Sequence, residues 1–389
     1  MNSRERFLAT MTFEKPDRAL LWEFGYWGGT IKRWYEEGLP KRRGLNPAIG
    51  YGHAAYAEGG SWDESERLRE FDVHDALGLD EGLRRISMNN FICPWFEPKL
   101  LEDHGEWVLR TDEWGITKRD RKDGGSLPHF LRGPVQNRED WERLKGERLQ
   151  PSLTGRLPAA WPQLLEEYRA RDYPLSIGTR HGFFGTPRWL MGTDKLLVTY
   201  YDDPELIRDM NAYLTDFWIA IYDRIIAQVK PDAAVLWEDM CYKTGPLISP
   251  AMFREFMLPY YKKLTGFFRD HGIDIVLLDT DGNLTQLIPL FIEGGITALY
   301  PFEVAAGMDV VEVRKTYPRL GILGGIDKRK IAESKVAIDE ELEARLPFML
   351  QFSGYIPYVD HLVPPDVSWQ NFTYYRQRVK EMVLEAIKA

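Results

Sequence analysis

The second half of the chain repeats one pattern, in which a short apolar run is followed by a polar or glycine-rich exit and then by a helical segment. Strands that are buried on both faces read as continuous apolar runs, and parallel neighbours need a crossover connection, usually a helix. The pattern therefore predicts repeated parallel βα units. The runs are PLSIG (174–178), AAVLW (233–237), DIVLL (274–278), ITALY (296–300), LGILGG (320–325) and YIPYV (355–359).

We predict an α/β fold in which these units close into a (β/α)8 barrel of the TIM type. The alternative is an open doubly wound sheet, but no GxGxxG motif follows a strand and no GxxxxGK[ST] motif occurs. One barrel domain is expected over residues 1–389, with irregular insertions over residues 38–150. Within the insertions, the runs 107–111 and 115–119 flank a turn and predict a small antiparallel hairpin outside the barrel.

Capping signals place the helices. Asp203 followed by Pro204 is a good N-cap for a helix with one apolar face, and Ser249 followed by Pro250 starts another that ends near Gly272. A kink is expected in the second helix at Pro259, because proline cannot donate the backbone hydrogen bond. Near the amino terminus, residues 4–13 predict a short amphipathic helix and residues 19–24 a buried strand.

Composition limits the classes of partner. The 50 basic and 59 acidic residues give a net charge of -9, and no stripe of Lys and Arg offers a nucleic acid a surface. No apolar run is long enough to span a bilayer, and the amino terminus has no signal-peptide core. Cys93 and Cys241 are far apart and form no CxxC pair. We expect a cytoplasmic protein that binds a small molecule, with no nucleic-acid or membrane partner.

Ionisable residues follow nearly every predicted strand. In barrels of this type the chemistry lies at the carboxyl ends of the strands. Carboxylates and imidazoles that converge there can bind a divalent metal, or they can act as acid and base, and the sequence leaves both interpretations open. The residues at these exits are Arg180, His181, Glu238, Asp239, Asp279, Asp281, Glu303, Asp327, Lys328, Asp360 and His361.

Several of these residues also have purely structural interpretations. Asp281, Gly282 and Asn283 are typical of a turn, in which Asn283 caps the next helix. Cys241 reads as a buried, inert thiol. The aromatic segment from Trp22 to Tyr35 fits core packing, and the alternative is a wall for a flat or apolar ligand.

Several separated segments, in the same order, resemble the uroporphyrinogen decarboxylase superfamily. The resemblance runs from residue 3 to about residue 380 and implies a TIM-type barrel. The segments are SRERFLATMTFEKPDR with LLWEF, then EDMCYKTGPLISPAMFREFMLPYYKKL, DTDGNLTQLIPLFIEGGITALYPFE, GGIDKR and DHLVPPDVSWQNFTYY.

The resemblance covers two functional branches. True porphyrinogen decarboxylases carry an Arg-Gln-Ala-Gly-Arg stretch after the first strand, and FGYWGGTIKRWYEEG (24–38) lacks it, although Lys32 and Arg33 lie nearby. Corrinoid-dependent methyltransferases bind zinc through a His-x-Cys-Gly stretch and a late Cys. The stretch DTDG (279–282) falls on the first of these, and Asp360 or His361 falls near the second. The chain is therefore closer to the methyltransferase branch, with harder donor atoms.

The leading hypothesis is a methyltransferase-like enzyme that uses a divalent metal, zinc first, and a corrinoid on a partner protein. The predicted metal ligands are Glu238, Asp279, Asp281 and His361, the catalytic residues Glu303, Arg180 and Lys328, and the substrate-binding residues Trp22, Tyr26, His181, Asn283 and Asp327. A metal-free decarboxylase is the second hypothesis. A non-catalytic module that binds a ligand or a corrinoid protein is the third.

Overall fold

A computed structural model of the chain describes residues 1–42, 71–122, 128–178 and 181–387. Its centre is a seven-stranded parallel sheet with the order β1-β6-β7-β10-β11-β12-β13. The strands are β1 (Arg84–Arg85), β6 (Leu175–Ile177), β7 (Ala233–Trp237), β10 (Val276–Asp279), β11 (Ala298–Tyr300), β12 (Gly321–Leu323) and β13 (Tyr355–Ile356). The curled α/β sheet confirms the predicted fold class, and each predicted run overlaps one of these strands.

Residues 19–26 bridge the two edges of this sheet. They are extended and mostly buried, as predicted, but only Tyr26 forms a β-bridge, with Val363 beyond β13. On the other side, the carbonyl of Leu21 accepts a hydrogen bond from the amide of Asp80, just before β1. The segment therefore takes the place of an eighth strand without the regular ladder that the sequence predicted.

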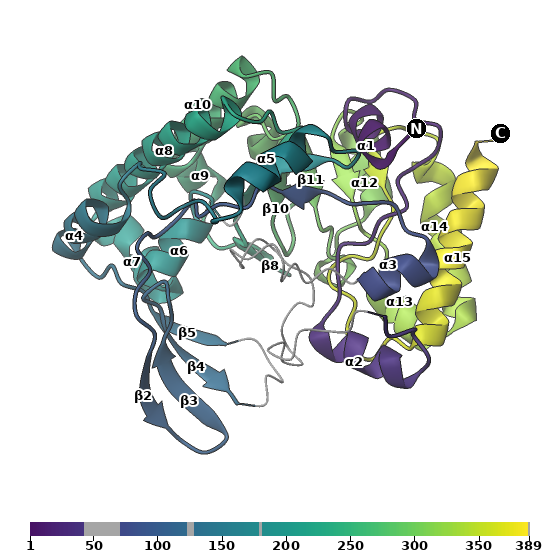
Figure 1. Cartoon of the computed structure of the whole chain (residues 1–389), viewed down its shortest axis with the longest axis horizontal. Helices are drawn as coiled ribbons and strands as arrows, with labels where there is room; N and C mark the ends of the chain where they lie inside the picture. Colours follow the sequence, from purple (N-terminus) through teal and green to yellow (C-terminus); the bar gives the residue numbers. More distant parts are fainter. Residues whose placement is uncertain (43–70, 123–127, 179–180, 388–389) are drawn as a thin grey trace.

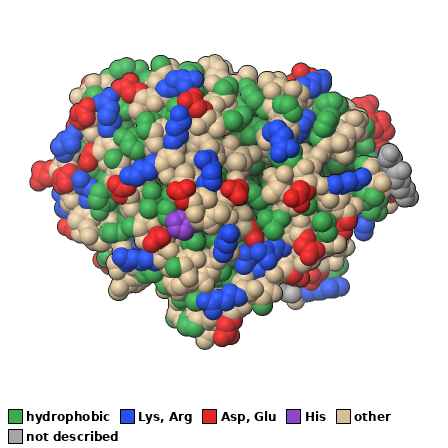
Figure 2. Space-filling view, turned by 90° about the horizontal axis from the view of Figure 1, so that it is seen from above, with side chains coloured by type: hydrophobic (Ala, Val, Ile, Leu, Met, Phe, Trp, Pro, Cys, Tyr) green, Lys and Arg blue, Asp and Glu red, His purple; other side chains and the backbone are tan. Residues whose placement is uncertain are grey.

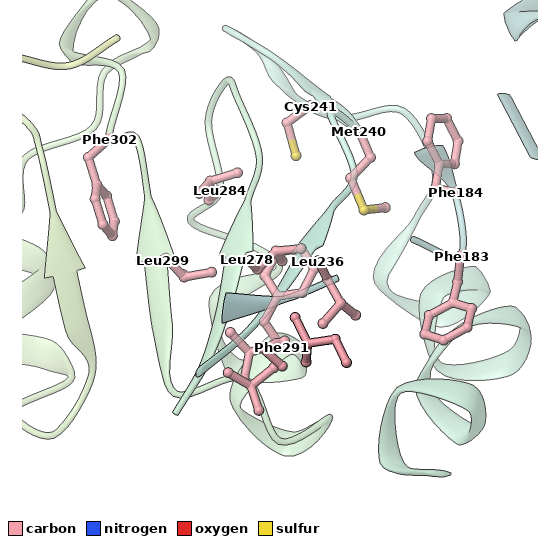
Figure 3. Close-up of a cluster of buried hydrophobic side chains, with 14 of the residues drawn as sticks. Phe183, Phe184, Leu236, Met240, Cys241, Leu278, Leu284, Phe291, Leu299 and Phe302 are labelled. Atoms are coloured by element: carbon pink, nitrogen blue, oxygen red, sulfur yellow. The ribbon is translucent and has the colours of Figure 1, made fainter. Parts of the chain in front are cut away.

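Alternation along the strands separates two apolar clusters. Val235, Leu277 and Ala298 belong to a cluster inside the curled sheet, together with Phe7 of α1 (Ser3–Met11). Their neighbours Leu236, Leu278 and Leu299 belong to the larger cluster between the sheet and the helices (Figure 3). Since successive side chains of a strand point to opposite faces, this alternation decides which strand-end residues face the interior.

The helices follow the expected capping signals. The side chain of Asp203 caps α8 (Pro204–Ile226), and that of Ser249 caps α9 (Pro250–Phe256). The predicted kink is a break at Met257, before α10 (Leu258–Asp270). The remaining helices are α2 (Gly28–Glu36), α3 (Phe71–Leu77), α4 (Arg138–Arg148), α5 (Trp161–Arg169), α6 (Gly185–Met191), α7 (Thr193–Asp202), α11 (Ile288–Glu293), α12 (Val310–Thr316), α13 (Lys328–Glu333), α14 (Lys335–Met349) and α15 (Trp369–Ala386), with a 3-10 turn η2 (Val304–Ala306).

The predicted hairpin is part of a larger antiparallel sheet with the order β2-β3-β4-β5. Its strands are β2 (Lys99–Asp103), β3 (Trp107–Thr111), β4 (Thr117–Arg121) and β5 (His129–Arg132). The sheet lies outside the parallel one, at the end of the molecule opposite α1 (Figure 1). A two-stranded ribbon, β8 (Cys241–Tyr242) with β9 (Gly245–Pro246), follows β7.

The surface carries charges of both signs. On the face shown in Figure 2, Lys and Arg side chains are interspersed with Asp and Glu. Among the helices of the described residues, none combines the length and the apolar character that a membrane crossing requires.

Candidate active site

Three strand-end residues form a layer at the top of the barrel interior. Asp279 of β10 is in register with Trp237 of β7 and with Tyr300 of β11. Tyr300 belongs to the interior cluster, and Asp279 lies two residues after Leu277, which also points inward. Tyr358, which follows β13, joins the same cluster. These side chains make a floor, with one carboxylate and several aromatic rings.

An ion pair lies above this floor. The Nε2 atom of His361 is 3.6 Å from the Oδ1 atom of Asp281, and the two side chains are 24% and 31% exposed. That Oδ1 atom has no hydrogen-bond partner among the described residues. The ring of Phe24 packs edge-on against the imidazole, with the ring centroids 5.7 Å apart. The pair is therefore held in place at the mouth of the barrel, where both side chains are partly exposed although the Asp281 Oδ1 atom itself is buried.

The two members of this pair have pKa values shifted in opposite directions. Burial is the largest single influence and raises the pKa of Asp281, but His361, Lys328 and Arg188 together lower it below its usual value. Burial is the largest single influence and lowers the pKa of His361, but the charge and the hydrogen bond of Asp281, with the charge of Glu303, together raise it above 6.5. Each group therefore favours the charged form of the other.

Asp239 lies beside the pair. Its backbone has a φ of +46°, which is rare for a residue other than glycine. Arg188 of α6 holds it there, because one guanidinium nitrogen donates to the Asp239 carbonyl at 2.8 Å and another lies 3.5 Å from its carboxylate. Burial and the nearby charge of Asp281 raise the pKa of Asp239 to about 7. This carboxyl group can therefore carry a proton near neutral pH.

Glu303 and Lys328 complete the rim of the mouth. The amide of Gly282 donates a hydrogen bond of 2.9 Å to the Glu303 carboxylate. Burial and the charge of Asp281 raise the pKa of Glu303. The Nζ atom of Lys328 is 3.6 Å from the carboxylate of Asp360, which is fully buried. Glu303 and Lys328, both predicted as catalytic, thus lie next to the predicted ligands Asp281 and His361.

Glu238 is not part of this mouth. It follows Leu236 on the outward side of β7 and is fully buried. Its carboxylate accepts hydrogen bonds of 2.8 Å from the amides of Phe183, Phe184 and Gly185, and another from the Tyr261 hydroxyl. These donors occupy both oxygens, so the predicted metal ligand holds the loop after β6 and leaves no oxygen for an ion.

Two predicted substrate-binding residues lie within the packing between the sheet and the helices. The ring of His181 is buried against Trp218 of α8 and lies within hydrogen-bond distance of Tyr222. Tyr26 is buried against Trp34 of α2 and Phe372 of α15. The structure therefore brings neither side chain to the mouth.

The other predicted substrate-binding residues have different surroundings. Asn283 stabilises its own turn, because its side chain bonds to the Ala306 carbonyl and to the Thr285 amide. Asp327 caps α13 and pairs with Arg329. Trp22 packs from the inside against Tyr358. Arg180, predicted as catalytic, lies outside the described residues.

The site residues predicted from the sequence do not include Asp239, Arg188 and Tyr358. The sequence places Asp239 at a strand exit but not among the predicted site residues. Asp239 follows Trp237 by two residues and so points to the other side of the sheet from Glu238, which is the signal that distinguishes the two. Tyr358 has the same two-residue spacing from the inward-pointing Ile356. Arg188 lies on a helix with no local motif, so only the folded chain shows that it reaches Asp239.

The donor set fits the predicted metal only in part. A separation of 3.6 Å between Asp281 and His361 is close to the roughly 3.4 Å that separates two ligands of one tetrahedral zinc ion. However, no three His, Cys, Asp or Glu side chains within the described ranges are arranged to hold an ion. A catalytic zinc usually takes three protein ligands. The described residues therefore do not form the predicted four-ligand site.

Comparisons with known proteins agree on the type of fold. A family model described as uroporphyrinogen decarboxylase (URO-D) matches residues 114–382. A methyltransferase structure from Methanosarcina mazei superposes with a TM-score of 0.61 at 15% identity, and the match covers 98% of this chain and 100% of that one. At this level of identity the superposition is evidence for the fold alone.

A curated protein gives a more specific similarity. The chain is 23% identical over 200 residues to methylcobamide:CoM methyltransferase MtbA of Methanosarcina acetivorans. The aligned part is 51% of this chain and 56% of that protein, so the match spans little more than half of the relative's length.

Proposed function

The chain belongs to the uroporphyrinogen decarboxylase family, and on this premise we propose that it is a methyltransferase-like enzyme that acts on a small molecule at the mouth of its barrel. The observation that carries the proposal is the ion pair of Asp281 and His361, with two carboxyl groups of raised pKa beside it. Such a cluster at the carboxyl ends of barrel strands is typical of an acid–base site. The similarity to a methylcobamide methyltransferase supports methyl transfer as the reaction.

The chemistry needs a proton donor. When a methyl group leaves its donor molecule for a nucleophilic acceptor, the electron pair of the broken bond stays on the leaving atom, which must then be protonated. Burial and the charge of Asp281 raise the pKa of Glu303 above its ordinary value, and in this proposal its carboxyl group delivers the proton. The ammonium group of Lys328 lies at the same rim and orients the substrate in this proposal.

The basic groups at the mouth argue against a substrate with many carboxylates, because such a substrate needs a cationic pocket. Each described basic group there already faces a carboxylate of the protein. Arg188 lies against Asp239, Lys328 against Asp360 and His361 against Asp281. This pairing favours methyl transfer over the decarboxylase hypothesis.

The methyl acceptor in this proposal is a corrinoid on a partner protein. The name of the curated relative also involves a corrinoid, although there the methylcobamide is the methyl donor. Zinc stays a prediction from the family resemblance, since the geometry brings together only two of the four predicted ligands. Elemental analysis of the purified protein tests whether zinc is bound. One equivalent of zinc in the wild type that is lost in Asp281→Ala would establish the ion. Only traces of zinc in the wild type would remove zinc from the proposal.

A methyl-transfer assay tests the function. The purified protein is mixed with free cob(I)alamin and a panel of methyl ethers, methylamines and methyl thioethers, and methylcobalamin is followed by its absorbance. We expect turnover with at least one class of donor, and a loss of about a hundredfold in Glu303→Gln, because a general acid contributes roughly that much. Glu293→Gln is the matched control, since Glu293 pairs with Arg254 and Lys262 on the surface.

The outcomes separate the hypotheses. Turnover that needs Glu303 supports the proposal. No methyl transfer from any donor, together with decarboxylation of a porphyrinogen, would replace it with the decarboxylase hypothesis. A stable complex with a corrinoid protein, without any methyl exchange, would make the chain a binding module.

A further inference from the structure

The hydroxyl group of Tyr358 is a buried polar group that the fold leaves without a partner. Its side chain is fully buried, and its Oη atom has no hydrogen-bond partner among the described residues. Buried polar groups nearly always have a partner, so each exception needs a physical explanation. The position of this hydroxyl supplies one.

Aromatic packing fixes the Tyr358 ring inside the barrel. The ring stacks on Phe24 with centroids 5.9 Å apart, and Trp22 packs edge-on against it at 5.5 Å. Its edge also lies against Gly324, where an added Cβ atom would come within 2.8 Å of the ring. The ring is therefore clamped between neighbours, and its hydroxyl has a defined place in the interior.

The surroundings of this hydroxyl are polar and acidic. Burial raises the pKa of Tyr358 well above its ordinary value, and the nearby Asp279 carboxylate adds to the effect. Tyr300 and Asp279 are the floor residues in register at the ends of β11 and β10. The phenol therefore keeps its proton, and it offers a hydrogen-bond donor at the floor beneath the Asp281–His361 pair.

We propose that Tyr358 is a substrate-binding residue whose hydroxyl donates a hydrogen bond to an uncharged oxygen atom of the substrate, an alcohol or a methyl ether. A donor without a partner calls for an acceptor, which an ammonium group does not have. A carboxylate oxygen is a poor match, because the Asp279 carboxylate beside the hydroxyl repels an anion. The inference rests on the proposed function, since it takes the mouth of the barrel as the substrate site.

A pair of isosteric probes tests the inference without a known substrate. Anisole is an aryl methyl ether, and ethylbenzene has the same shape without the oxygen. Ligand-observed NMR titrations of the full chain compare their dissociation constants. We expect the wild-type protein to bind anisole about threefold to tenfold more tightly, the range of one neutral hydrogen bond. Tyr358→Phe should remove this preference while ethylbenzene affinity stays the same.

Tyr355→Phe is the matched control. Tyr355 is also fully buried, but its hydroxyl already donates to the Gly324 carbonyl at 3.2 Å, and its ring belongs to the outer cluster. The preference for anisole should survive this change. Equal affinity for the two probes in the wild type, or no binding of either, overturns the inference. So does a preference that persists in Tyr358→Phe.

The test is independent of the methyl-transfer assay. If no donor is turned over but the preference for anisole depends on Tyr358, the proposed function fails and the oxygen-binding role stands. If an amine or a thioether is turned over equally well by the wild type and by Tyr358→Phe, the proposed function stands and this inference fails.

Discussion

Glu238 and Asp281 look alike in the sequence, since each acidic residue closely follows an apolar strand of the barrel. In the structure they are opposites. Glu238 is fully buried, and backbone amides and the Tyr261 hydroxyl occupy its carboxylate. Asp281 is 31% exposed, faces His361 and has an oxygen without a hydrogen-bond partner among the described residues. The comparison shows that a carboxylate at a strand end can be either a structural anchor or a reactive group.

The alternation of the strand explains the difference. Glu238 points to the same side of the sheet as Leu236, which packs under the helices. The buried amides of residues 183–185 need a hydrogen-bond acceptor on that side. Asp281 comes two residues after Asp279, and Asp279 points to the same interior side of the sheet as Leu277. One position is therefore sealed by the helices, and the other opens at the mouth of the barrel.

The largest expected effect is on stability. Glu238→Ala should lower the free energy of unfolding by about 3–5 kcal/mol, because it leaves several buried donors without an acceptor. Glu238→Gln should lose less, since the amide keeps one acceptor oxygen. Denaturant unfolding measures both, with Asp281→Ala as the control that should stay within about 1 kcal/mol of the wild type. If Glu238→Ala lowered the free energy of unfolding by less than about 1 kcal/mol, the anchoring role would be contradicted.

The next effect is on activity. Asp281→Ala should lower the rate of methyl transfer by about a hundredfold while the protein unfolds at nearly the same denaturant concentration, because the change removes the partner of His361 at the mouth. The cobalamin assay with the best methyl donor measures the rate. If Asp281→Ala kept full activity, the reaction would have to take place elsewhere on the protein.

The smallest effect is a shift in one titration. The pKa of His361 lies above 6.5 because the charge and the hydrogen bond of Asp281, with the charge of Glu303, together exceed the effect of burial, so Asp281→Asn should lower it. The stability that the protonated ring contributes is present below its unfolded pKa and is lost as the pH rises through the folded pKa. NMR titration of the histidine Cε1–H signals measures the shift. Glu238→Gln should leave the His361 pKa unchanged, and an equal shift in both variants would refute the contrast.

The sequence predicted the fold well because the fold depends on periodic patterns. The run AAVLW is β7 residue for residue, and Asp203 caps α8 as expected. The region from residue 38 to 105 was harder, because β1 (Arg84–Arg85) is only two polar residues long and carries no apolar signal. Its pairing with β6 makes it a strand, and two arginines in a row give no sign of that pairing.

The site was predicted only in outline. The rule that polar groups gather at strand exits led to Asp281, His361, Glu303 and Lys328, which do lie together. The same rule led to Glu238 and to His181, which lie on the helix side of the sheet. The rule predicts the end of the barrel at which a residue lies, but not whether its side chain points into the barrel or toward the helices.

The sequence by itself determined the parallel βα architecture, the end of the barrel that carries the ionisable groups and the family to which the chain belongs. These follow from local periodicity, capping and motif order, which a linear chain displays directly. The tertiary structure decided which carboxylate is an anchor and which is open, that Arg188 reaches Asp239, and that the Tyr358 hydroxyl has no partner among the described residues. These depend on contacts between residues distant in the chain, and burial and charge act only once folding has brought those residues together.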